Sequence, residues 1–138
     1  MSATFTMYGR EFMQKALFTP TEFLPIANLQ VALCRSAPAA NAAVSQLLEP
    51  STLDGYARVN YSTGAGKWAP TGFAEFYNVD EIVFGAAAAD WGWISGFALL
   101  DPLAGQCVVV GSLSTPFVAT LGAIPKLEAG AISLGLYD

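Results

Sequence analysis

The sequence predicts a single mainly β domain: an antiparallel β-sandwich of the jelly-roll or immunoglobulin-like kind, preceded by a short N-terminal α-helix. Three observations lead to this class. Apolar residues recur every three to four positions only near the N-terminus, short apolar runs fill the rest, and turn residues separate those runs. The 138 residues suit one domain, 1–138, and the second half leaves no room for the helical crossovers of a parallel sheet.

The N-terminal helix is predicted near residues 7–18. Tyr8, Phe12 and Ala16 continue a spacing of three to four that starts at Phe5, and charged or amide residues stand between them. A threonine just before the helix can cap its first turn. The Thr-Pro pair that follows ends it, because the residue before a proline avoids helical backbone angles.

Short apolar runs bounded by turn residues predict the strands. In the first of them, Leu29, Val31 and Leu33 alternate with Gln, Ala and Cys. The run from Trp93 to Leu100 predicts a buried strand that ends at an Asp-Pro turn. The expected strands cover residues 29–34, 55–61, 73–77, 81–84, 93–100, 106–113, 117–120, 123–127 and 131–137.

Three connections between the strands carry distinct expectations. We expect loops at 36–43 and 62–72, the second of which carries Trp68 in a stretch rich in Gly, Thr and Pro. Residues 44–49 can form one helical turn before a proline, and residues 86–89 fit either a helical turn or a tight loop.

The composition predicts that much of the surface is covered in the working state. Charged residues make up 12% of the chain, against a usual fraction of about 25%. Apolar residues make up 54%, and the mean hydropathy is +0.45, which excludes intrinsic disorder. A soluble protein with so few charges is most simply explained if copies of itself or a partner cover its apolar surface.

Charge and hydropathy patterning also exclude two classes of partner. The net charge is −5 without a basic cluster, so nucleic acid is not an expected partner. The longest uncharged run, 102–125, contains three prolines and cannot form a membrane-spanning helix. The N-terminus has no basic residue before an apolar core, so we expect no secretory signal and reduced, buried cysteines at Cys34 and Cys107.

Residues that could carry chemistry are few. Histidine is absent, which removes the commonest general base and metal ligand, and two cysteines cannot complete a four-ligand zinc site. We therefore expect no enzyme activity, no cofactor and no metal. A small hydrolase that uses Asp90 or Asp101 is the remaining catalytic hypothesis, although nothing in the sequence brings these two carboxylates together.

The three tryptophans, Trp68, Trp91 and Trp93, are candidate interface residues. They could form a stacking platform for a sugar, but core or subunit packing is the favoured interpretation. On a regular strand, Trp91 and Trp93 would face the same side. We expect a tight loop at this point, with Asp90 accepting hydrogen bonds from the amides that follow it and Gly92 supplying backbone freedom. One of Trp91 and Trp93 is then expected to anchor the loop against the core, while the other faces a neighbouring subunit.

Arg58 is predicted to form a structural ion pair, with Asp90 or Asp101 as its partner, or to anchor a turn; a position on a solvated strand face is the alternative. It is one of only 6 basic residues, and its neighbours in the predicted strand are apolar. Tyr56, from the same strand, and Phe12, from the helix, complete the set of structural or interface candidates.

Six short segments resemble a family of small tailed-phage virion proteins that are labelled tail fibre proteins, with related proteins that decorate capsids. The resemblance extends over nearly the whole chain. Its helix and β-rich fold agree with the elements predicted above, whereas 18–29 and 44–54 depart from the family pattern. The matching segments are 31–34 with 36–38, 55–58, 89–92, Phe97 with Asp101, Gly111 with Leu113 and 115–116, and 130–131 with Leu134.

This resemblance implies a non-enzymatic structural protein of the virion, assembled in the host cytoplasm. The leading hypothesis is a capsid cement or decoration protein that stabilises the particle through protein–protein contacts. The alternative is a tail-fibre or baseplate component that touches host glycans. In either case the expected partners are other copies of the chain, with a trimer favoured, and the major capsid protein or other virion proteins.

Overall fold

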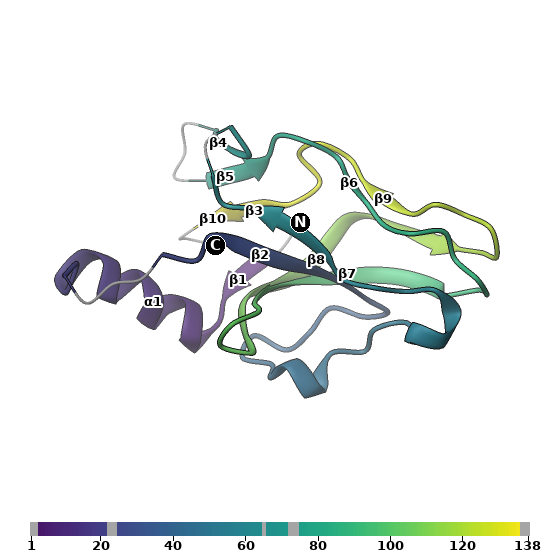
Figure 1. Ribbon diagram of the computed structural model, residues 1–138, viewed down its shortest axis with the longest axis horizontal. Coiled ribbons are helices and arrows are strands. Elements are labelled where there is room, and N and C mark those ends of the chain that lie inside the picture. The colour runs from purple at the N-terminus through teal and green to yellow at the C-terminus, as the bar shows by residue number, and fades with distance from the viewer. Residues whose placement is uncertain (1–2, 22–24, 65, 72–74, 136–138) are drawn as a thin grey trace.

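The computed structural model describes residues 3–21, 25–64, 66–71 and 75–135, and it confirms a mainly β protein with one N-terminal helix (Figure 1). All strand pairs are antiparallel among these residues. The elements are β1 (Ala3–Phe5), α1 (Met7–Phe18), β2 (Asn28–Cys34), the 3-10 turns η1 (Val44–Gln46) and η2 (Thr52–Asp54), β3 (Val59–Ser62), β4 (Trp68–Pro70), β5 (Glu75–Asn78), β6 (Ile82–Val83), β7 (Gly92–Asp101), β8 (Gln106–Ala119), β9 (Lys126–Leu127) and β10 (Ser133–Gly135).

A five-stranded sheet in the order β1-β8-β7-β2-β3 forms the centre of the molecule (Figure 1). Two smaller sheets, β10-β5-β4 and β6-β9, lie over one of its faces. β2 pairs with the second half of β7, from Gln30 opposite Leu100 to Cys34 opposite Gly96. This arrangement agrees with the sandwich-like packing that the spacing of the apolar runs predicts.

α1 begins and ends at the predicted residues because both ends are capped. The Thr6 hydroxyl accepts a hydrogen bond from the Gly9 amide at 3.1 Å and donates one to the carbonyl of Cys107, which fastens the helix start to β8. Gly9 lies against the carbonyl of Val108, where a Cβ atom would not fit. At the other end, the amide and hydroxyl of Thr19 both donate to the carbonyl of Lys15.

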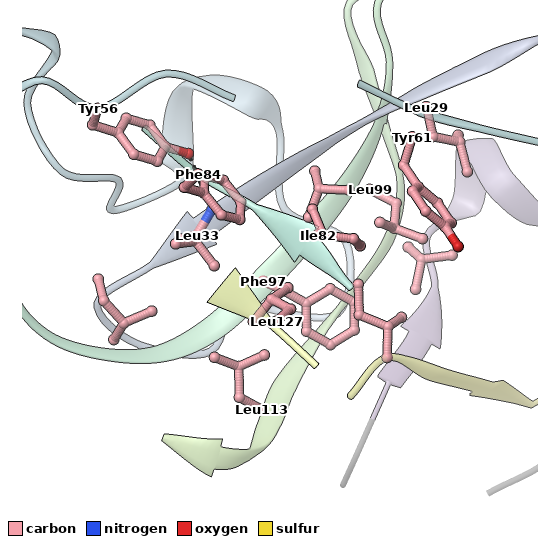
Figure 2. Close-up of a cluster of buried hydrophobic side chains, with 14 of the residues drawn as sticks. Leu29, Leu33, Tyr56, Tyr61, Ile82, Phe84, Phe97, Leu99, Leu113 and Leu127 are labelled. Atoms are coloured by element: carbon pink, nitrogen blue, oxygen red, sulfur yellow. Dashed lines mark hydrogen bonds between the residues drawn. The ribbon is translucent and has the colours of Figure 1, made fainter. Parts of the chain in front are cut away.

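The five-stranded sheet is buried on both faces. Leu33, Phe97 and Leu99 point from one face into the larger core, where side chains of the small sheets such as Ile82 and Leu127 meet them (Figure 2). On the other face, a second core forms over the same strands. Its buried members are Ala32, Cys34, Ala42, Leu47, Ala98, Leu100, Cys107 and Val110.

No strand covers this second core among the described residues; the irregular segment 36–54 does so instead. Ala42 and Leu47 pack down from this segment, and the amide of Arg35 donates to the carbonyl of Leu48 at 2.9 Å. The segment approaches the sheet most closely at Gly96, where a Cβ atom would lie 2.6 Å from the Ser36 carbonyl oxygen and 2.7 Å from the Ala37 Cα. Glycine at this position therefore allows the cover to reach the sheet.

Two stretches that the sequence did not predict as strand belong to strands in the structure. Residues 68–70, predicted as part of a loop, form β4 at the edge of the small sheet, where Pro70 is tolerated. The two predicted strands at 106–113 and 117–120 are one strand, β8. Pro116 does not interrupt it because the β7–β8 register shifts between Gly96/Ser112 and Ile94/Phe117, so this stretch lies outside the regular ladder.

Other predicted strands are correct in place but longer than the observed ones. In place of the strand predicted at 55–61, the paired strand is Val59–Ser62, and the strands predicted at 81–84 and 123–127 shrink to two residues each. Residues 44–46 form the expected helical turn, and residues 86–89 are a loop. The strand predicted at 73–77 begins, and the one predicted at 131–137 ends, outside the described residues.

Both cysteines are buried and unpaired, as predicted. Burial, followed by the nearby Glu49 charge, raises the pKa of Cys34 to about 12, and burial also raises the pKa of Cys107. These thiols are therefore protonated packing residues at neutral pH. Among the described residues, no helix has both the length and the apolar character needed to cross a membrane.

The contact at Gly96 predicts an asymmetric effect of two Gly→Ala substitutions. Gly96→Ala should lower the free energy of unfolding by about 1–3 kcal/mol, because the new methyl group overpacks the sheet against segment 36–54. Gly85→Ala is the matched control, since its Cβ would meet only the Gly55 carbonyl oxygen at 3.8 Å. Urea unfolding of both variants tests this, and equal unfolding midpoints would contradict the close approach.

Candidate interaction surface

A half-buried carboxylate, Glu49, fixes segment 36–54 in place. Its Oε1 accepts hydrogen bonds from the Tyr56 hydroxyl at 2.6 Å and from Arg58 Nε at 2.9 Å, and its Oε2 accepts one from an Arg58 terminal nitrogen at 2.8 Å. The Tyr56 hydroxyl also accepts from the Leu33 amide in β2 at 3.0 Å. One carboxylate thus connects the segment, through Tyr56, to the central sheet (Figure 2 shows Tyr56 and Leu33).

The electrostatics of this cluster favour ionised Glu49 and neutral Tyr56. Burial alone would raise the pKa of Glu49, but hydrogen bonds from Arg58 and Tyr56, together with the guanidinium charge, hold it below its usual value. Burial and the adjacent carboxylate raise the pKa of Tyr56, so the phenol keeps its proton. The bidentate pair is only partly exposed, with 30% of the Arg58 side chain and 16% of the Glu49 side chain accessible.

The ion pair corrects the predicted partner of Arg58. Neither Asp90 nor Asp101 contacts it; the partner is Glu49, nine residues earlier in the chain. Sequence reasoning overlooked Glu49 because it lies in an irregular stretch without periodicity. The available signal was that Glu49 is the only charged residue between Arg35 and Asp54, and a lone carboxylate in a long apolar stretch needs a buried partner.

Trp91 anchors the loop that precedes β7. Its side chain is 1% exposed, its indole nitrogen donates to the Asp54 carbonyl at 2.8 Å, and its amide donates to the Ala119 carbonyl at 2.8 Å. The ring meets Tyr56 edge to face at 5.4 Å, and Tyr56 in turn stacks on Phe84 at 6.3 Å. Trp91 therefore joins η2, the end of β8 and the Glu49 cluster.

Trp93 faces the opposite way from Trp91, as expected for a tight loop in which one tryptophan anchors against the core, and not as on a regular strand. Gly92 between them has a φ of +81°, so the regular alternation of a strand does not apply. Trp93 is 54% exposed and lies directly opposite Val118 of β8, which is also exposed. The two residues form an apolar pair on the surface of the hairpin.

The two candidate aspartates occupy opposite ends of β7 and have separate structural roles. Asp90 accepts from the Leu121 amide at 2.7 Å, rather than from the amides that follow it as predicted. Asp101 accepts from the Tyr8 hydroxyl at 2.7 Å and from the Leu103 amide at 3.1 Å. No group of three or more potential metal ligands occurs in the part of the chain that the structure describes.

The segments η2, the loop before β7 and the loop after β8 meet at one end of the molecule (Figure 1), and they and the adjoining strand ends carry five exposed apolar residues. Backbone hydrogen bonds hold these segments together: the Ala88 amide donates to Asp54, Ala87 to Ala123, and Gly122 to Ala87. We call this surface the apolar end. Its residues are Leu53, Trp93, Val118, Leu121 and Ile124.

The remaining candidates lie away from the apolar end. Trp68 packs edge to face on Tyr61 at 5.3 Å and donates to the Ser62 carbonyl, so it supports the small sheet. Phe12 is half-buried on α1, with its ring 6.4 Å from that of Tyr8. The three tryptophans thus form no common stacking platform, because Trp91 is buried and Trp68 and Trp93 belong to different sheets.

The model of the family described as Podophage GP4 fiber I protein gp80 matches residues 4–135, which is nearly the whole chain. No curated protein matches the sequence. The matched range includes the Glu49 cluster, Trp91 and all residues of the apolar end.

Arg58→Ala should lower the free energy of unfolding by about 2–3 kcal/mol, because it leaves the half-buried Glu49 carboxylate without its charged donor. Lys67→Ala is the matched control: the Lys67–Asp80 distance is also 2.8 Å, but both side chains are exposed to solvent. The control should unfold at the wild-type urea concentration. A similar loss in both variants would show that the Glu49 pair has no special role.

The lowered pKa of Glu49 predicts a pH dependence with a definite sign. Since the folded-state pKa lies below the unfolded value of about 4.3, the unfolded chain binds the proton more readily. The stabilisation from Glu49 is therefore present above the unfolded pKa and is lost as the pH falls through the folded pKa. Urea unfolding between pH 7 and pH 3 should show a shallower acid loss for Glu49→Gln than for the wild type; parallel curves would contradict this assignment.

Proposed function

We propose that the chain, which belongs to the family described as Podophage GP4 fiber I protein gp80, is a non-enzymatic structural subunit of a phage fibre. The observation that carries the proposal is the family match over residues 4–135. Membership of a phage fibre family supports a location in the virion and a structural role. The fibre position itself, as against another position on the particle, is our inference.

The contacts of the candidate residues support a structural role. The two thiols are buried with raised pKa values, and each candidate aspartate accepts a hydrogen bond from a backbone amide in a loop. Glu49 and Arg58 neutralise each other and tie segment 36–54 to the sheet. Each of these groups is thus used to hold the fold.

We assign attachment to the apolar end. Trp93 and Val118 are neighbours on β7 and β8, and Leu121 follows them directly in the loop. Large aromatic and aliphatic side chains dominate the energetics of protein interfaces, and a stable interface buries about 1,600 Å² in total. Several copies that contact one another or a neighbouring virion protein through this end would cover the surface that the low charge content leaves apolar.

Capsid cement is the second candidate function, and one observation favours it as well. A charge fraction of 12% suits a protein that lies permanently against a capsid lattice as well as it suits a fibre subunit. The two functions differ in location and copy number, so one image of the particle separates them.

Cryo-electron microscopy of the phage particle, with this protein carrying a small fused label, tests the proposed location. We expect label density on a fibre of the tail. Density distributed over the capsid surface would overturn the fibre assignment and establish decoration in its place.

Substitution at the apolar end should impair assembly without unfolding the subunit. Trp93→Ser together with Leu121→Ser should lower incorporation into particles at least about tenfold, while the thermal midpoint changes little because both side chains are exposed. Phe76→Ser is the matched control, since Phe76 is similarly exposed at 49% but lies in the small sheet. Quantitative mass spectrometry of the particles measures the incorporation of each protein. Equal incorporation of the wild type, the double variant and Phe76→Ser would exclude the apolar end as the attachment surface.

A further inference from the structure

Residues 38–47 are the part of segment 36–54 that covers the second core, and we call them the lid. The segment runs below the central sheet in Figure 1. The two ends of the lid lie close together, because the Arg35 amide before it donates to the Leu48 carbonyl after it at 2.9 Å. A compact surface loop of this length whose ends meet is an Ω-loop.

The lid is ordered by its own hydrogen bonds. The Ala42 amide donates to the Ala39 carbonyl at 3.0 Å, and the Gln46 amide donates to the Ala43 carbonyl at 2.9 Å. The side chain of Gln46 also accepts from the Ala43 amide at 2.8 Å. These bonds close two successive turns, so the lid can move as one body.

Few contacts join the lid to the rest of the protein. It contains no charged residue, and four of its ten residues are alanine. Within the described parts of the chain, the hydrogen bonds that leave the lid belong to Asn41, whose Oδ1 accepts from the Met7 amide at 3.1 Å and whose Nδ2 donates to the Met7 sulfur at 3.2 Å. Of the lid residues, only Ala42 and Leu47 are buried. A segment with so few contacts opens at a lower free energy than the whole domain unfolds.

The chain on both sides of the lid is held firmly. Before it, the Arg35 carbonyl accepts from the Ser95 hydroxyl of β7 at 2.9 Å. After it, the Glu49 carboxylate accepts from both Arg58 and Tyr56. Motion of the lid is therefore confined between two fixed points.

The two thiols of the protein lie in the second core, which the lid covers. Cys34 is 0% and Cys107 is 2% exposed. While the lid is closed, burial holds the pKa of both thiols above its usual value and keeps them protonated. Once water reaches them, their pKa returns towards about 8.5 and a reactive thiolate forms. The reactivity of the thiols therefore reports whether the lid is open.

We propose that the lid opens as one unit in the folded subunit, while the central sheet and the Glu49 cluster keep their native contacts. Opening breaks the contacts between Asn41 and Met7 and removes Ala42 and Leu47 from the second core. The lid thereby controls when disulfides and other small electrophiles reach the two thiols. This device goes beyond the proposed function, and it rests on none of the residues of the apolar end.

Thiol labelling with dithiodipyridine, a small aromatic disulfide, tests the proposal when its rate is measured against urea concentration. The cysteine thiolate attacks one sulfur of the reagent, the S–S bond of the reagent breaks, and a pyridinethiolate with its own absorbance leaves. Below the unfolding transition we expect a slow rate that hardly depends on urea, because opening the lid exposes little surface. A rate that follows global unfolding at every urea concentration would overturn the proposal, as would immediate labelling.

Two asparagine variants test what holds the lid closed. Asn41→Ala should raise the urea-independent labelling rate about three- to tenfold, because it removes the side chain that bonds the lid to the start of α1. Asn60→Ala is the matched control, since Asn60 is also exposed but lies in β3, outside the lid, and it should label like the wild type. Equal rates in Asn41→Ala and the wild type would overturn the proposal.

The urea dependence of the wild-type rate needs no variant, so the test stays decisive even if Asn41→Ala fails to fold. All of these measurements use the free subunit and none involves particle assembly. A failure of the lid would therefore leave the fibre assignment untouched, and a failure of the fibre assignment would leave the lid untouched.

Discussion

The bond between Glu49 and its two donors is the interaction on which the rest of the structure depends. The central strands β2, β7 and β8 carry buried residues on both faces of the sheet, and the smaller sheets cover only one of these two faces. The irregular segment 36–54 covers the other face, and it needs a fixed contact to stay in place. Glu49 provides that contact by accepting hydrogen bonds from Arg58 and Tyr56, while the Tyr56 hydroxyl accepts one from the backbone of β2.

The same cluster gives the apolar end a rigid base. The edge-to-face contact between Tyr56 and Trp91 links the Glu49 carboxylate to the loop before β7. Trp91 in turn donates hydrogen bonds to carbonyl groups of η2 and of the end of β8. Trp93 stands one residue beyond Gly92, directed to solvent by the positive φ of that glycine. A surface that is already ordered loses little conformational entropy on binding, which favours assembly. The chain itself belongs to a phage fibre family.

Local rules predicted the elements whose signals are local, and they missed contacts set by the tertiary structure. α1, β2, β7 and the buried cysteines follow from capping, alternation and apolar runs. Strand parity alone would have put both tryptophans on one side, whereas the tight loop expected around Gly92 puts Trp93 on the side opposite Trp91. The Glu49 partner of Arg58 was missed because it depends on how segment 36–54 folds back.

Hydrogen exchange compared between the free protein and intact particles tests the central claim most directly, namely that the chain assembles through its apolar end. The account predicts that amides in 90–95 and 117–124 gain protection on assembly, while those of α1 and β2 exchange as they do in the free protein. Protection gained on α1 and β2, with the apolar end unchanged, would contradict it and place the assembly contact at the opposite end of the molecule.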